Sequence, residues 1–242
     1  MTLKSRLPKK RTLQTCKPYD RLQAGNGLAE DLAKLAIAKT KSTPRFEGER
    51  HMSQIMPDGS VKQAEYMGPR TQIEKRVSML LNGNTEVRPI TMSDGVSMIH
   101  DIDYSLAQLS KTKEEQLARV READLAMLKR LKKIKAKKLD TPANILLGEA
   151  GIGSKVQIEK KGKIGATLAG LTIGGPVGAL VGHAIGSKAK TKMQDIAGPL
   201  VIRTPSEVSK LLKAKNGMSG ALESSGVGSG LLAQMQNGKF NY

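Results

Sequence analysis

The chain has very few of the residues that build covalent frameworks or large cores. Its 242 residues include one cysteine, no tryptophan and only 2% aromatic residues. The single cysteine excludes an internal disulfide and a cysteine-based zinc cluster. With so few aromatic side chains, we expect one small helical domain with poorly ordered or partner-dependent flanks. Residues 1–20 contain no apolar run, so we expect no secretory signal peptide.

Acidic residues are also scarce relative to basic ones. The chain carries 40 Lys and Arg against 22 Asp and Glu, a formal net charge of +18. This charge exceeds what solubility needs and indicates a polyanionic setting, either nucleic acid or an anionic membrane. The basic run Pro8-Lys9-Lys10-Arg11 predicts a nuclear-localisation signal or a contact with nucleic acid.

One of only three histidines, His100, lies in a stretch with helical periodicity. The apolar positions of that period are Val96, Ile99, Ile102, Leu106 and Leu109. Tyr104 falls one turn after His100 on the same face, whereas Asp101 points about 100° around the helix. A neutral histidine can take a proton from water while a neighbouring carboxylate binds a cation, which is a hydrolytic arrangement. The alternative is a histidine and an aspartate on a helix surface without function.

Residues 113–138 are predicted to form a second long helix. Its apolar line consists of Leu117, Val120, Met127, Leu131 and Ile134. Asp124 interrupts this line, and a buried carboxylate there requires a partner from elsewhere in the chain. His100 can donate one N–H to Asp124, which would fix its tautomer and leave the other nitrogen as a base. If Asp124 instead lies at the surface, no such pair forms.

Upstream of these helices, several short motifs occur in a fixed order. They are Tyr66-Met67-Gly68-Pro69-Arg70, Arg88-Pro89, Asp94 and His100-Asp101-Ile102-Asp103-Tyr104, followed by Asp124. Together they resemble the phospholipase A2 domain of parvovirus minor capsid proteins and of Maverick/Polinton-type elements. The pattern of that family is Tyr-x-Gly-Pro-Gly, a Pro and an Asp before the helix, His-Asp-x-x-Tyr and a later Asp. The resemblance covers roughly residues 66–134, under a third of the chain.

The resemblance implies a mainly α fold whose small core has two long antiparallel helices preceded by a calcium-type loop. It also implies three catalytic residues. His100 would be the general base that activates a water, Asp124 would orient His100, and Tyr104 would support the network. The implied reaction is calcium-dependent hydrolysis of the sn-2 ester of a phospholipid.

The implied cofactor is Ca²⁺, held by the Asp101 carboxylate and by the backbone carbonyls of Tyr66, Gly68 and Arg70. Arg70 departs from the family, which has glycine at this position. A non-glycine residue in the left-handed conformation costs roughly 1–2 kcal/mol. With one side-chain carboxylate in the site, we expect calcium affinity no better than about 10⁻⁴–10⁻³ M, and a catalytically degenerate site is an open alternative.

The first half of the chain divides into two predicted parts. Residues 1–64 form a basic tail and linker with a short helix over residues 27–38, and His51 lies in the linker of residues 39–59 without a role. Residues 65–140 form the phospholipase A2-like helical domain, which includes a short helix over residues 72–81.

The second half begins with a lysine-flanked, apolar segment, residues 141–192. Within it, residues 164–187 contain no charged residue, and a glycine recurs at every fourth position from Gly170 to Gly186. Such a stripe is typical of a helix that packs closely or spans a bilayer, although a glycine-rich linker is the alternative. Residues 193–242 are expected to hold a short helix that Gly217 ends, followed by a Gly/Ser-rich tail.

Taken with the resemblance, these features predict a viral minor capsid protein that aids membrane penetration during entry. Its expected partners are phospholipid membrane, capsid proteins and, through the basic tails, viral nucleic acid. Its expected location is the capsid interior of the virion until entry, with the host nucleus as a further location. Two alternatives stay open: a degenerate, basic structural protein that binds packaged nucleic acid, and a membrane-active protein that works through its glycine zipper.

Overall fold

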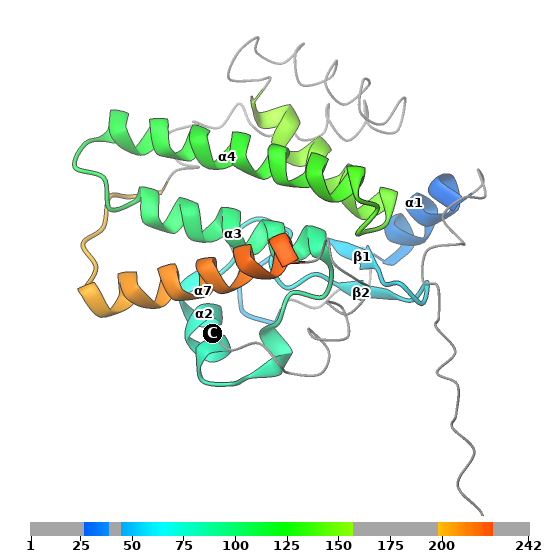
Figure 1. Cartoon of the computed structure of the whole chain (residues 1–242), viewed down its shortest axis with the longest axis horizontal. Helices are drawn as coiled ribbons and strands as arrows, with labels where there is room; N and C mark the ends of the chain where they lie inside the picture. The colour runs from blue at the N-terminus through cyan, green and yellow to red at the C-terminus, as the bar shows by residue number, and fades with distance from the viewer. Residues whose placement is uncertain (1–26, 39–44, 157–197, 225–242) are drawn as a thin grey trace, which may run out of the picture.

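The computed structural model describes residues 27–38, 45–156 and 198–224 (Figure 1). Over these ranges the chain is mainly helical, and its two strands are short. The predicted mainly α class is confirmed. The basic tail of residues 1–26, the glycine stripe of residues 164–187 and the tail of residues 225–242 lie outside the described residues.

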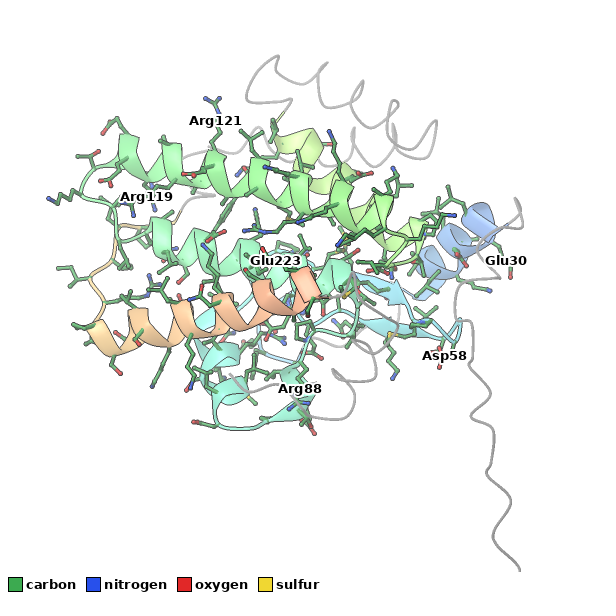
Figure 2. All side chains as sticks on the ribbon, viewed as in Figure 1. Glu30, Asp58, Arg88, Arg119, Arg121 and Glu223 are labelled. Atoms are coloured by element: carbon green, nitrogen blue, oxygen red, sulfur yellow. The ribbon has the colours of Figure 1, made fainter. Side chains whose placement is uncertain are left out.

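Two long helices, α3 (Met92–Ala107) and α4 (Lys113–Ala136), lie side by side and run antiparallel (Figure 1). Each begins at a threonine N-cap: Thr91 accepts from the Asp94 N–H, and Thr112 accepts from the Glu115 N–H. Their facing apolar stripes form the main core, whose fully buried members include Val96, Ile99, Ile102 and Leu131. Figure 2 shows Arg121 of α4 projecting away from this core.

The opposite side of α3 is covered by α2 (Ile73–Leu81) and α7 (Pro205–Ser224) (Figure 1). Gly95 allows this approach, because a Cβ there would lie 2.7 Å from the Met218 methyl carbon. The prediction that Gly217 ends the last helix is wrong. The helix continues to Ser224 because Met218 and Ala221 are buried in the core, and this packing outweighs the weak helix propensity of glycine.

A small hairpin precedes the helices. Strand β1 (Ser53–Ile55) pairs antiparallel with β2 (Val61–Gln63), with Gln54 opposite Lys62. Asp58 lies at the tip of the turn, as Figure 2 shows, and Gly59 adopts a φ of +82°. The predicted linker over residues 39–59 is therefore wrong for residues 45–59, which are described and largely packed. The short helix η3 (Thr85–Val87) links α2 to α3.

Helix α1 (Gly27–Ala38) has the predicted bounds, and its Leu35 packs with Ile55 and Ala143. A further helix spans residues 142–156 and contacts α4, where Gly148 meets the Leu131 side chain. The packed body therefore extends beyond the range 65–140 on both sides. None of the helices in the described ranges is long and apolar enough to cross a membrane.

Candidate active site

The structure brings His100 of α3 and Asp124 of α4 together, as the sequence predicts. His100 Nε2 lies 2.8 Å from Asp124 Oδ1, and the Asp124 side chain is fully buried. The hydrogen bond pairs a carboxylate with a ring nitrogen, so Nε2 carries the proton and donates it. His100 Nδ1 is then left as an acceptor. The arrangement can therefore supply a base.

Two further groups reach the same carboxylate. The Tyr104 hydroxyl donates to Asp124 Oδ1, and the Tyr104 ring lies 4.2 Å from the His100 ring, centroid to centroid. Lys155, from the helix over residues 142–156, donates to Asp124 Oδ2 at 2.6 Å and also to the Tyr104 oxygen. Asp124 thus receives three side-chain donors, all consistent with an ionised carboxylate.

The pKa values of His100 and Asp124 shift in opposite directions from their ordinary values. Burial alone would raise the pKa of Asp124, but the hydrogen bond from His100 and the charge of Lys155 outweigh it and lower that pKa. Burial alone would lower the pKa of His100, but its interactions with Asp101 and Asp124 outweigh it and raise that pKa above 6.5. His100 is therefore a stronger base than a free histidine.

The loop that contains Tyr66 and Gly68 is fastened to the start of α3 by one buried carboxylate. The Asp94 carboxylate accepts four hydrogen bonds of 2.8–3.1 Å from backbone N–H groups. The donors are Glu65, Tyr66, Met67 and Ile90. Burial raises the pKa of Asp94 to about 6, against the opposing effect of these four hydrogen bonds. Sequence reasoning placed Asp94 in the first turn of the helix but missed this contact with the loop.

The loop also packs against residues 50–52. The Met52 N–H donates to the Met67 carbonyl at 2.8 Å, and the Arg50 N–H donates to the Pro69 carbonyl at 3.3 Å. Gly68 is required here, since a Cβ at this position would lie 2.2 Å from the Arg50 carbonyl oxygen. Arg70 adopts a φ of +67°, the left-handed conformation that the family glycine would favour, and its side chain is exposed.

Two of the proposed cation ligands, the carbonyls of Tyr66 and Gly68, meet at the Thr71 hydroxyl. Thr71 Oγ1 lies 3.4 Å from the Tyr66 carbonyl oxygen and 3.3 Å from the Gly68 carbonyl oxygen. His51 Nε2 lies 3.3 Å from the same hydroxyl. One hydroxyl proton cannot be donated to both carbonyls at once.

The carboxylate of Asp101 is a further proposed ligand of the cation. Its Oδ1 lies 3.4 Å from His100 Nδ1, and its buried Oδ2 has no hydrogen-bond partner within the described ranges. Burial raises the pKa of Asp101, and interactions with His100 and Thr71 oppose this only in part. An unsatisfied carboxylate oxygen near two carbonyls that converge on one hydroxyl fits a hard cation such as Ca²⁺. The part of the chain that the structure describes has no cluster of three or more His, Cys, Asp or Glu side chains suited to a metal, so such an ion would depend on backbone oxygens.

His51 is the histidine to which sequence reasoning assigned no role. The structure buries it beside Thr71, and burial together with the charge of Arg76 lowers its pKa. Arg76 is itself fully buried and pairs with Glu49 at 2.6 Å, which holds the segment before His51 against α2. The turn signal Pro57-Asp58-Gly59 could have revealed that this segment forms a hairpin.

Comparison with family models, with curated proteins and with solved structures finds no match to this chain.

Proposed function

We propose that the protein is a calcium-dependent phospholipase A2-type hydrolase that cleaves the sn-2 ester of phospholipids. The observation that carries this proposal is the pairing of His100 Nε2 with the buried Asp124 at 2.8 Å, while Nδ1, the other ring nitrogen, lies 3.4 Å from Asp101 Oδ1. A tautomer fixed by a carboxylate on one nitrogen, with an unsatisfied carboxylate beside the other, suits base-catalysed attack by water.

In this mechanism His100 Nδ1 takes a proton from a water as the water oxygen attacks the ester carbonyl carbon. Asp124 stabilises the imidazolium through Nε2, and the Tyr104 hydroxyl fixes the position of Asp124. His100 then gives the proton to the leaving oxygen, so the products are a fatty acid and a lysophospholipid. A positioned base of this kind contributes about 10²–10⁴ in rate.

The residues that would hold calcium are Asp101 and the carbonyls of Tyr66, Gly68 and Arg70. Thr71 is an added candidate, because its hydroxyl lies within 3.4 Å of two of these carbonyls. A bound calcium ion would polarise the ester carbonyl and stabilise the negative charge that develops on its oxygen.

The alternative function is a catalytically degenerate structural protein that binds packaged nucleic acid. One observation favours it: Arg70 holds a left-handed conformation at φ +67°, which costs roughly 1–2 kcal/mol for a non-glycine residue. The net charge of +18 fits either an anionic membrane or nucleic acid. Binding of DNA that weakens steeply with salt, without lipid hydrolysis, would favour this alternative.

The setting within a virion is part of the same proposal. It rests on the resemblance to viral minor capsid proteins. The proposed partners are capsid proteins and membrane. The proposed locations are first the virion and then the host nucleus. The basic run Pro8-Lys9-Lys10-Arg11 supports the nuclear step.

The experiment is release of labelled fatty acid from phospholipid vesicles that carry the label at the sn-2 position. The wild type is assayed with millimolar calcium or with chelator, beside His100→Gln and Asp124→Asn. The matched control is Arg119→Gln, because Arg119 lies on α4 but is half-exposed and pairs with Glu115. We expect calcium-dependent release that falls by about 10²–10⁴ in both site variants and is unchanged in the control.

Release that persists in His100→Gln would overturn the proposed mechanism. Absence of release from folded wild type, at every calcium concentration, would leave the degenerate alternative as the better account.

A further inference from the structure

Lys155 lies at the end of the helix over residues 142–156, yet its ammonium group reaches the carboxylate between α3 and α4. It donates to Asp124 Oδ2 at 2.6 Å and to the Tyr104 oxygen, and its nitrogen lies 4.7 Å from the centre of the Tyr104 ring. Its side chain is 15% exposed. No periodic pattern in the sequence connects Lys155 to Asp124, 31 residues earlier.

The two oxygens of Asp124 have different partners. Oδ1 accepts from His100 Nε2 and from the Tyr104 hydroxyl, whereas Lys155 donates to Oδ2. Without Lys155, Oδ2 would be a buried charged atom that lacks its cationic donor, and the carboxylate could turn about its last side-chain bond. The direction of Oδ1 toward His100 therefore depends on what holds Oδ2.

We propose that Lys155 is a positioning residue: it holds Asp124 Oδ2 so that Oδ1 stays directed at His100 Nε2. This inference rests on the proposed function, since the rate of hydrolysis is one of its readouts. The lowered pKa of Asp124 is consistent with it, because the charge of Lys155 favours the carboxylate form.

Another lysine provides a matched control. Lys215 of α7 pairs with Asp103 of α3, also at 2.6 Å, so it bridges a different helix to a different carboxylate. If both ion pairs were purely structural, Lys155→Met and Lys215→Met would affect His100 in the same way. A positioning role predicts that only Lys155→Met disturbs the histidine.

The first readout is the NMR signal of the His100 Nε2 proton, measured at pH 8 with chelator and without lipid. In wild type, and in Lys215→Met, the proton held by Asp124 should give a downfield signal that exchanges slowly with water. In Lys155→Met we expect this signal to broaden or vanish through faster exchange, and Lys155→Arg should restore it. Lys155→Gln replaces Lys155→Met if the latter fails to fold by circular dichroism, with the same expected result.

The second readout is vesicle hydrolysis with calcium. Misplacement of the base should lower kcat by about 10–100-fold in Lys155→Met and leave KM within about two-fold, because substrate binding is not touched. An unchanged Nε2 proton signal in a folded Lys155→Met or Lys155→Gln would overturn the inference. A lost signal together with an inactive wild type would support the role of Lys155 and contradict only the proposed function.

Discussion

The two halves of the site are built in different ways. The dyad half consists of side chains on helices, where His100, Tyr104 and Lys155 all contact the buried Asp124. The cation half consists mainly of backbone on a loop, held from outside by Asp94. Asp124 has donors at both oxygens, whereas Asp101 in the cation half has a buried oxygen without a partner in the described ranges.

This difference indicates what each half needs. The dyad is already assembled by protein groups alone, because helix packing fixes its side chains and each oxygen of Asp124 has a donor. Asp101 Oδ2 has no hydrogen-bond partner within the described ranges, so a cation or a water would complete the cation half. We therefore expect that substitutions can damage either half and leave the other intact.

Replacement of the carboxylate that fastens the loop should have the largest effect. Asp94→Ala removes the acceptor of four backbone N–H groups, so we expect a loss of about 3–5 kcal/mol in the free energy of unfolding. Urea denaturation followed by circular dichroism measures this loss. The control is Asp58→Ala in the exposed hairpin turn, where Asp58 bonds only locally to Ser60.

If Asp94→Ala and Asp58→Ala lower stability equally, Asp94 does not fasten the loop. The Nε2 proton signal of His100 should survive in folded Asp94→Ala, because the dyad does not depend on the loop. Its disappearance would contradict the independence of the two halves.

A smaller loss is expected from Gly68→Ala. The added Cβ would lie 2.2 Å from a backbone oxygen of Arg50, so the two segments must separate, which costs about 1–3 kcal/mol. Calcium binding, measured by calorimetry, should weaken more than thermal stability suggests, since Gly68 supplies a proposed ligand. Gly151→Ala is the control, because its Cβ would meet nothing within 4 Å. Unchanged calcium binding in Gly68→Ala would place the ion elsewhere.

The dyad half could be predicted from the sequence. The bounds of α2 and α4 follow from the sequence to within two residues, and Asp124 could be recognised as a polar residue inside an apolar stripe. These are local patterns, in which the spacing of apolar residues along one helix indicates the face that is buried. Lys155 could not be found in this way, because its contact with Asp124 depends on the packing of two helices.

The surroundings of the loop were predicted less well. The motif around Tyr66 and Gly68 is visible in the sequence, but the residues that hold this loop in place are distant from it in the sequence. The 45–59 segment was interpreted as a linker because it is polar, yet Glu49 is buried against Arg76 and His51 against Thr71. A segment that is buried through polar pairs shows no periodic pattern of apolar residues. Reasoning from such patterns therefore predicts that the segment is exposed to solvent.

The two described histidines should titrate on opposite sides of the ordinary pKa of 6.5. The pKa of His100 is raised, so its stabilising contribution is present below pH 6.5 and is lost as pH rises through its folded pKa. The pKa of His51 is lowered, so its contribution is present above pH 6.5 and is lost as pH falls toward its folded pKa. NMR titration with chelator, in a His183→Gln background that removes the third histidine, measures both.

Asp124→Asn should lower the pKa of His100 and leave that of His51 unchanged. In vesicle hydrolysis, activity requires neutral His100, so the wild-type rate should fall as the pH is lowered. A His100 pKa below 6.5 would mean that burial outweighs the two carboxylates.

The smallest effect is expected where the loop departs from the family pattern. Arg70→Gly removes a left-handed, non-glycine residue, whose strain of roughly 1–2 kcal/mol corresponds to an increase in calcium affinity of at most about 5–30-fold. Lys138→Gly is a matched control, because Lys138 is also exposed and also has a positive φ, of 54°, but lies beyond the end of α4. Both variants relieve backbone strain, so thermal stability should change alike in both. Only Arg70→Gly should tighten calcium binding in calorimetry, because only Arg70 contributes to the loop. Equal calcium affinity in the two variants would mean that Arg70 does not limit the site, and that any weakness of the cation half has another cause.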